Sequence, residues 1–320
     1  MVGWNVARLC DRPVRTTERT VRTMAQTGKD RMIAKSVQRR NYLPASASGA
    51  PSVIAPISFI VPQDEKPFYR GQALTGGEPE FAFALENHDV KIADCRPIAD
   101  ALSLSANGFA LRHAPTAIVD FYDDEAVRGA YFAEIEALLK EELGAARVVV
   151  FDVTRRADSA HGAGNTDGSR TPAFRAHVDY TEGSGPARAR EVLGAEDFDR
   201  WMACGARVLQ VNVWRPIAGP VRRSPLAVAD GASVARSDLI ATDQIFPDRV
   251  GELYHLAHNP AQRWYYAPEM ARDEVFLILG WDSAAPKGGN VAPHSAFALP
   301  DQESAPTRES IEVRAFVVVE

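Results

Sequence analysis

His177 and Asp179 are separated by one residue, and together they could offer a nitrogen and an oxygen ligand to a metal ion. In an extended strand, residues i and i+2 point to the same face, so the two side chains would lie next to each other. Of the seven histidines in the chain, only His177 has an acidic residue two positions later. About one such pair is expected by chance at this composition, so the interpretation depends on a third ligand.

His294 is our candidate for the third ligand. Two histidines and one carboxylate form the facial triad that holds non-haem Fe(II) and leaves coordination positions open. His294 lies between a predicted strand that ends near Asp282 and the last predicted strand of the chain. The alternatives are His255 and His258, whose spacing of three residues is typical of a helix face rather than of one strand face. On sequence order we favour His294.

A second polar group begins fourteen residues after His294 and could bind a carboxylate. The guanidinium fork of Arg308 and the hydroxyl of Ser310 would lie on one strand face, and such a fork binds a carboxylate through two hydrogen bonds. The same Arg-x-Ser pattern occurs at residues 222–224, so the pattern alone is weak. The plain alternative is a solvated edge strand whose charges pair with each other. The residues that would share this face are Arg308, Ser310, Glu312 and Arg314.

Helical patterns precede these motifs. Acidic residues at 123–125 suit the start of a helix, apolar residues then recur at helical spacing, and Gly144 is placed to end it. A strand is predicted over residues 147–153. A weaker helical stretch, interrupted by Gly194, is predicted over residues 189–202.

After Gly205 the chain changes to short strand-like runs separated by turn residues such as Gly219-Pro220 and Asn259-Pro260. Many short strands at short spacing are typical of a sandwich or barrel. The predicted fold class is therefore α+β, mainly β, with a jelly-roll core and helices packed outside it. The predicted strands of this half are 207–214, 226–229, 253–258, 263–266, 274–281 and 311–319.

The composition is that of an ordinary globular chain, with 320 residues of which 46% are hydrophobic and 24% charged. The longest apolar run, residues 275–281, is far shorter than the roughly 20 residues that a membrane helix needs. Three widely separated cysteines exclude a disulfide-rich scaffold and a structural zinc finger. The net charge is +7 for residues 1–50 and −13 for residues 51–320, and so acidic a body argues against a nucleic-acid partner.

Residues 1–52 are expected to form a basic, disordered N-terminal extension, and residues 53–320 a single domain. The extension ends in a segment rich in Pro, Ser and Ala at residues 44–52, which is typical of linkers. It holds no apolar stretch before a small-residue cleavage site, so we expect a cytoplasmic protein. The alternatives for this segment are a later start at Met24 or Met32, a transit peptide or a basic anchor.

Taken in this order, the motifs resemble those of the hydroxylase/desaturase family of fungal and bacterial secondary metabolism, within the Fe(II)/2-oxoglutarate-dependent oxygenases. The resemblance extends from about Ser58 to Val319. Short segments carry it, namely residues 119–125, 149–152, 177–181, 211–216, 219–221, 225–228, 258–260, 263–266, 273–275, 282–283, 293–297 and 308–314.

The resemblance implies a double-stranded β-helix core, an Fe(II) ion, 2-oxoglutarate as cosubstrate and O₂, with release of succinate and CO₂. It also implies a small, largely apolar metabolite as the substrate, which is hydroxylated or desaturated. Arg308 matches the arginine that binds the distal carboxylate of the cosubstrate, with Ser310 beside it and Arg314 as a further cation. The residues that match the metal ligands are His177, Asp179 and His294. Four residues match recurrent family positions without an assigned role, namely Asn212, Trp214, Arg263 and Tyr265.

The alternative functions are a metal-dependent hydrolase and a non-catalytic jelly-roll protein that binds small molecules. A hydrolase could use the same three ligands to activate water, but it would not need a carboxylate-binding arginine after the distal histidine. Both metal-dependent functions require His294 within roughly 5 Å of His177 and Asp179. Residues 161–170 are glycine-rich and form either a lid or, as we favour, a surface loop.

We expect that deletion of residues 1–50 leaves folding and activity intact, because their charge and the linker that follows place them outside the domain. The measurement is the yield of soluble protein and its turnover of 2-oxoglutarate, compared with the full chain. Loss of soluble, active protein on deletion would show that this segment belongs to the fold.

Overall fold

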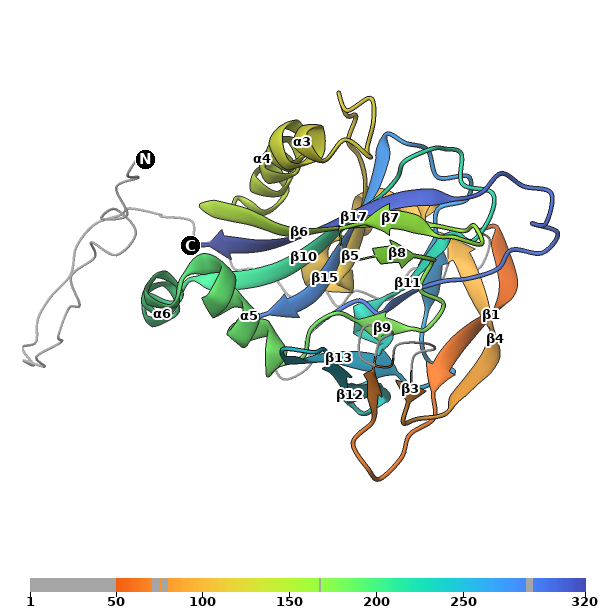
Figure 1. The fold of residues 1–320 in the computed structure, drawn as a ribbon, viewed down its shortest axis with the longest axis horizontal. Helices are drawn as coiled ribbons and strands as arrows, with labels where there is room; N and C mark the ends of the chain where they lie inside the picture. The colour runs from red at the N-terminus through yellow and green to blue at the C-terminus, as the bar shows by residue number, and fades with distance from the viewer. Residues whose placement is uncertain (1–49, 71–74, 76–79, 167, 286–289) are drawn as a thin grey trace, which may run out of the picture. The chain divides into compact units, whose positions relative to one another are not determined.

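β-Strands are the main regular elements of the described chain, and all but two of them form two large sheets (Figure 1). The structure is a computed structural model, and it describes residues 50–70, 75, 80–166, 168–285 and 290–320. The expected N-terminal extension lies outside the described residues except for its last three, of which Ser52 begins the first strand.

The larger sheet holds the first strands of the chain and the short strands that carry the predicted metal ligands. It is antiparallel except where β14 pairs with β4 and where β2 pairs with β12. In spatial order its strands are β1 (Ser52–Ile60), β4 (Leu85–Asp94), β14 (Trp264–Tyr266), β11 (Leu226–Ala229), β16 (His294–Ala296), β9 (His177–Val178), β13 (Val250–Leu256), β12 (Leu239–Ile245), β2 (Phe68–Arg70) and β3 (Glu80–Phe81).

The smaller sheet is antiparallel throughout. In spatial order its strands are β5 (Phe109–His113), β15 (Glu274–Asp282), β10 (Arg207–Pro216), β17 (Glu309–Val319) and β6 (Arg147–Ala157). Alternation along β17 gives this sheet two different faces. Ile311, Val313 and Ala315 pack into an apolar cluster with the helix above the sheet, whereas the residues between them point toward the larger sheet.

The helices pack outside the sheets, as predicted (Figure 1). Buried Tyr131, Ile135 and Leu139 join the apolar cluster on the outer face of the smaller sheet. The helical elements are η2 (Arg96–Ala101), α2 (Leu104–Asn107), α3 (Asp124–Ala126), η3 (Val127–Tyr131), α4 (Phe132–Leu143), α5 (Ser184–Leu193), α6 (Ala195–Ala203), η4 (Gly231–Ser233) and η5 (Arg236–Asp238).

The helix predicted over residues 123–144 is confirmed as α3, η3 and α4 in succession, ended by Gly144 in the left-handed conformation with φ 61°. The start of the second predicted helix, residue 189, was wrong, because α5 already begins at Ser184. The Thr181 hydroxyl accepts hydrogen bonds from the backbone N–H groups of Gly183 and Ser184, which starts the helix before its apolar pattern begins. Gly194, with φ 89°, divides this stretch into α5 and α6.

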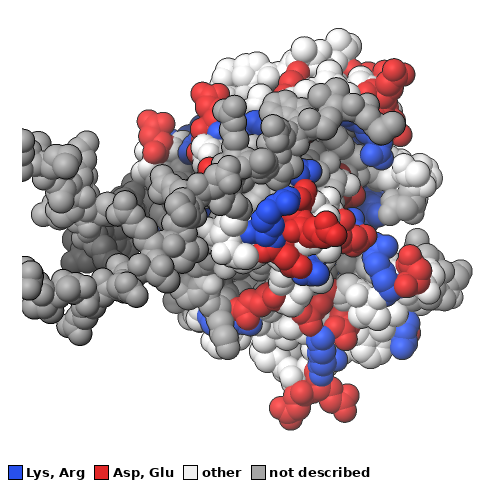
Figure 2. Space-filling model, turned by 90° about the vertical axis from the view of Figure 1, so that its left-hand side faces the viewer, with Lys and Arg blue, Asp and Glu red and all other residues white. Residues whose placement is uncertain are grey.

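The predicted fold class, α+β and mainly β with a jelly-roll core, is confirmed. An apolar cluster between the sheets joins Trp214, Phe276 and Ile278 of the smaller sheet to Val228 and Tyr265 of the larger one. Within the described residues, no helix is long and apolar enough to cross a membrane. On the face shown in Figure 2, basic and acidic side chains are intermingled rather than gathered into separate patches.

We expect Gly185→Ala to destabilise the domain by about 1–3 kcal/mol, because overpacking of a filled site has that cost. A Cβ at Gly185 would lie 2.5 Å from Cγ of Trp281, which is buried beneath α5. Gly129→Ala is the matched control, since nothing lies within 4 Å of a Cβ there. The measurement is the free energy of unfolding in urea. Equal free energies of unfolding for the two variants would contradict the close packing of α5 against Trp281.

Candidate active site

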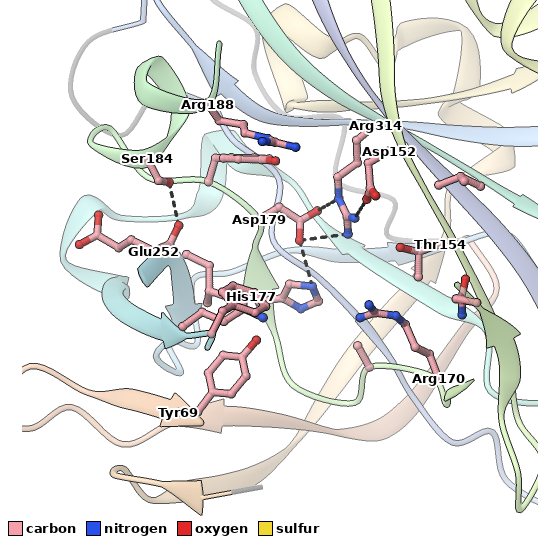
Figure 3. A pocket seen from close by; sticks show the side chains of 18 of the residues that line it. Tyr69, Asp152, Thr154, Arg170, His177, Asp179, Ser184, Arg188, Glu252 and Arg314 are labelled. Carbon is pink, nitrogen blue, oxygen red and sulfur yellow. Dashed lines mark hydrogen bonds and ion pairs between the residues drawn. The ribbon is translucent and has the colours of Figure 1, made fainter. Parts of the chain in front are cut away.

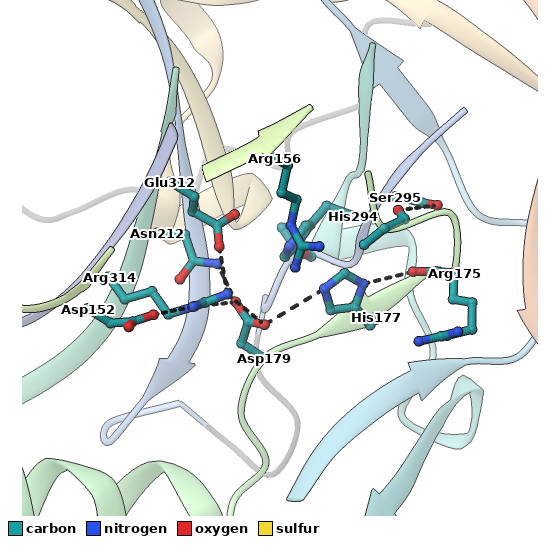
Figure 4. A network of polar contacts seen from close by, with 12 residues as sticks. Asp152, Arg156, Arg175, His177, Asp179, Asn212, His294, Ser295, Glu312 and Arg314 are labelled. Atoms are coloured by element: carbon teal, nitrogen blue, oxygen red, sulfur yellow. Dashed lines mark hydrogen bonds and ion pairs between the residues drawn. The ribbon is translucent and has the colours of Figure 1, made fainter. Parts of the chain in front are cut away.

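The structure brings His177, Asp179 and His294 together, with one ligand atom of each within 4.8 Å of the others. His177 in β9 and His294 in β16 lie directly opposite each other in adjacent strands, with ring centroids 4.5 Å apart. Asp179 lies one residue beyond β9, and its Oδ1 is 3.7 Å from His177 Nε2 (Figure 4). Two ligands that each bind one ion at about 2.1 Å can be up to about 4.2 Å apart, so this spacing suits a shared metal.

Backbone carbonyls fix the protonation of both imidazoles. His177 Nδ1 donates to the carbonyl of Arg175 at 2.7 Å, and His294 Nδ1 donates to the carbonyl of Ala292 at 3.3 Å. Each proton is therefore on Nδ1, which leaves the lone pair of Nε2 available to a metal. Burial and the neighbouring His294 lower the pKa of His177 to about 3, so this imidazole stays neutral.

The Asp179 carboxylate is half-buried but remains charged. Burial alone would raise its pKa, but the guanidinium of Arg314 and the hydrogen bond from Asn212 outweigh burial and hold the pKa well below the usual range. Arg314 Nε donates to Asp179 Oδ2 at 3.0 Å, and Arg314 Nη2 lies 3.4 Å from Oδ1. The same guanidinium also pairs with Asp152 and, at 2.7 Å, with Glu312. The structure thus places Arg314, a predicted cosubstrate cation, against a carboxylate of the ligand group.

A chain of buried amides supports the same carboxylate. Asn212 Nδ2 donates to Asp179 Oδ2, and Gln210 Nε2 donates to Asn212 Oδ1 at 2.7 Å. Both amides come from β10 of the smaller sheet. A Cβ at Gly280 would lie 1.9 Å from Gln210 Oε1, so this glycine leaves the space that the amide occupies. Asn212, which sequence analysis left without a role, therefore orients the carboxylate of Asp179.

Arg308 lies in a small recess beside the two imidazoles. The recess is lined by His177, Trp214, Leu226, His294, Arg308 and Glu312, among others. Its volume of about 20 Å³ has room for the end of a ligand, not for a whole one. The Arg308 guanidinium lies over the Trp214 ring, with Cζ 5.5 Å from the centroid. Arg308 is 3% exposed, and Ser310 beside it is also buried but does not line the recess.

The Arg308 guanidinium has incomplete hydrogen bonding. Nη1 donates to the carbonyl of Ser224 at 2.9 Å, while the buried Nε has no partner. Burial, together with the positive charge of Arg156, lowers the pKa of Arg308 to about 9. Arg156 also lines the recess and points toward the imidazoles (Figure 4). Two guanidiniums thus share the recess with one carboxylate, that of Glu312, which pairs with Arg314.

A much larger cavity of about 1170 Å³ opens on the other side of His177 (Figure 3). His177 and Arg156 line both the recess and this cavity, so a ligand held by its end in the recess could reach the metal ligands. The glycine-rich segment at residues 161–170, which we favoured as a surface loop, contains a hairpin of β7 (Ala163–Asn165) and β8 (Gly168–Arg170). Residues of this hairpin form part of the cavity wall.

The alternative histidines are not in the ligand group. His255, in β13, lies opposite His177 of the adjacent strand. Its Nδ1 instead bonds the Thr242 hydroxyl at 3.0 Å, and its ring centroid lies 4.9 Å from that of Phe83. His258 stacks on His88 with ring centroids 3.8 Å apart. The remaining two family positions also lie apart from the ligands: Arg263 pairs with Asp230 at 2.7 Å, and Tyr265 belongs to the apolar core.

Comparisons with known proteins agree with this geometry. Residues 57–318 match a family described as an oxidoreductase/YMDC permease-like domain. The chain is 34% identical to the Fe(II)/2-oxoglutarate-dependent dioxygenase nvfI of Aspergillus novofumigatus, over 75% of this chain and 87% of that protein. It is 32% identical to the hydroxylase/desaturase efuI of Hormonema carpetanum, over 71% of this chain and 82% of that protein. A solved structure of the iron and alpha-ketoglutarate-dependent endoperoxidase NvfI superposes with a TM-score of 0.73 and 31% identity, over 84% of this chain and 98% of that one.

The chain belongs to the Fe(II)/2-oxoglutarate-dependent dioxygenases. The predictions of an oxygenase rather than a hydrolase or a binding protein, and of Fe(II) and 2-oxoglutarate as its cofactor and cosubstrate, are thereby confirmed. Sequence analysis did not single out Arg156 or Gln210 in this dioxygenase. Both are single residues within long strands, and only the pairing of those strands shows that they approach the site.

We expect Asn212→Leu to weaken metal binding roughly ten- to hundredfold, as loss of a partner that orients a ligand commonly does. The measurement is titration of the metal-free dioxygenase with Mn(II), followed by the loss of the free-ion electron paramagnetic resonance signal. Asn259→Leu is the control, because Asn259 also donates to a buried carboxylate, that of Asp238, at 3.2 Å. Thermal unfolding of both variants separates lost binding from lost folding. Mn(II) affinity equal to that of the control would refute the role of Asn212.

Proposed function

We propose that His177, Asp179 and His294 hold the Fe(II) of this dioxygenase, that Arg308 binds the distal carboxylate of 2-oxoglutarate, and that the large cavity takes a small organic substrate. The observation that carries the proposal is the buried Arg308 guanidinium, which has an unpartnered Nε in a recess that adjoins both imidazoles.

The donor set suits ferrous iron. Two imidazoles and one carboxylate would occupy three coordination positions and leave the others for small ligands. Because each Nδ1 is held by a backbone carbonyl, each ring already presents Nε2 to the metal position and does not need to rotate. Arg314 and Asn212 hold Asp179 in its charged form, which is the form that binds a cation.

The recess suits one end of a dicarboxylate. A buried guanidinium without an anion is costly, and a carboxylate that enters the recess would supply the missing charge and accept the free N–H. Ser224, whose φ of 46° is left-handed, directs its carbonyl at Arg308 Nη1 and so limits the orientation of the fork. Glu312 also lines the recess, but it pairs with Arg314 and therefore leaves Arg308 to a ligand.

The bound metal with 2-oxoglutarate and O₂ supplies the oxidising chemistry, and the protein supplies positions and a protected site. His177 lines both spaces, so the cosubstrate and the organic substrate would meet at the metal ligands. The names of the relatives include hydroxylase, desaturase and endoperoxidase. We propose hydroxylation or desaturation of an unactivated C–H bond, a reaction in which the bound metal supplies the chemistry and no side chain needs to act as a nucleophile.

We expect anaerobic addition of Fe(II) and then 2-oxoglutarate to give the weak visible charge-transfer band of the chelate. His177→Ala should abolish the band. Arg308→Met should shift its formation to roughly ten- to hundredfold higher 2-oxoglutarate concentration, the expected effect of losing charge-assisted hydrogen bonds. The measurement is absorbance against 2-oxoglutarate concentration.

Arg263→Met is the control for this titration, since Arg263 pairs with Asp230 away from the recess. A band that forms normally in Arg308→Met would move the cosubstrate site elsewhere. A protein that binds Fe(II) but forms no band would refute the proposed ligand roles as a whole.

A further inference from the structure

A third cation, Arg175, lines the large cavity but not the recess. We propose that Arg175 binds a carboxylate of the organic substrate, so that the substrate of this dioxygenase is an organic acid. This inference rests on the proposed function, because it concerns the ligand that would share the cavity with the bound cosubstrate. It goes beyond that function by naming the substrate's chemical class.

Among the described residues, no anion pairs with the partly buried guanidinium of Arg175, and its buried Nε has no hydrogen-bond partner. The guanidinium lies against two neighbouring aromatic rings, with Cζ 4.7 Å from the Phe81 centroid and 5.8 Å from the Tyr69 centroid. Aromatic faces stabilise a cation and hold it in place, but they do not satisfy its N–H groups. A carboxylate would both stabilise the cation and accept hydrogen bonds from its N–H groups.

Several other arginines that line this cavity already have carboxylate partners. They are Arg155 with Asp124 at 2.7 Å, Arg188 with Glu191 at 2.6 Å, Arg249 with Asp248 at 3.8 Å, and Arg314 with Asp152 and Asp179. The acidic residues of this wall are also paired, since Lys66 bonds both Asp243 and Glu252 at 2.5 and 2.6 Å. Among the described residues, no carboxylate of the wall is therefore left to pair with Arg175.

The position of Arg175 relates the anion to the metal ligands. Arg175 precedes His177 by two residues, and its own carbonyl accepts the His177 Nδ1 proton. Along an extended chain, the Cα atoms of two residues with this spacing are about 7 Å apart. A carboxylate held at Arg175 would thus leave the carbon atoms several bonds away closest to the metal, which is where an unactivated C–H bond would be oxidised. A cavity of about 1170 Å³ has room for such a molecule.

The test compares acids with their neutral amides. The probes are naphthalene-2-carboxylate with naphthalene-2-carboxamide, and decanoate with decanamide, which present two different shapes. Each is titrated by calorimetry, without O₂, into the full chain saturated with Mn(II) and 2-oxoglutarate, so that Arg308 is already occupied. We expect the acids to bind roughly ten- to hundredfold more tightly than the amides, as for a charge-assisted hydrogen bond.

Arg175→Met should remove this preference, whereas Arg188→Met, which changes a paired arginine of the same cavity, should keep it. Cosubstrate binding, followed by the Fe(II) charge-transfer band, should be unchanged in Arg175→Met. The inference is overturned if the acids do not bind, if acid and amide bind equally, or if Arg175→Met keeps the preference. A wild-type chain that forms no chelate contradicts the proposed function. A normal chelate without acid preference contradicts this inference alone.

Discussion

The ion pair between Arg314 and Asp179 joins the two sheets at the metal ligands. Asp179 follows β9 of the larger sheet, and Arg314 belongs to β17 of the smaller one. Asn212 lies directly opposite Arg314 in the β10–β17 register, so both partners of the carboxylate depend on the same strand pairing. A slip of either strand by one residue would turn its side chain to the opposite face, toward the apolar cluster beneath the helices. The register of the smaller sheet therefore orients Asp179, a candidate ligand that follows a strand of the larger one.

The charged side chains inside the domain fall into two groups: those that already have a partner of opposite charge, and those that a ligand could still pair with. Asp179, Asp152 and Glu312 all share the Arg314 guanidinium, so each of these carboxylates has a cationic partner. The cations that line the recess are paired less completely. Burial lowers the pKa of Arg308, and its buried Nε has no hydrogen-bond partner among the described residues. Because an uncompensated buried charge costs free energy, a ligand that brings the missing anion also stabilises the fold. Ligand binding and stability are thus expected to be linked at this site.

The sequence predicted the parts of the site that depend on short spacing. His177-x-Asp179, the position of His294 and the alternation after Arg308 could be recognised because strand geometry repeats every two residues. The local conformation differs from the expectation, since Asp179 lies beyond β9 and turns toward Arg314. Strands such as β12, in which polar residues interrupt the apolar ones, were not predicted. Contacts such as that between Asn212 and Asp179 link distant segments, and no single segment carries a signal for them.

His177 is the one metal-ligand candidate that borders both the recess and the large cavity, and this position constrains how two ligands can be bound at once. His294 faces only the recess, while Asp179 faces only the cavity. A dicarboxylate anchored at Arg308 would therefore approach from the side of His294, and an organic substrate from the side of Asp179. Arg308 lines the recess and Arg175 lines the large cavity, so under both proposals each anion would have its own cation. Shape and distance would then separate the two ligands, although both would carry a carboxylate.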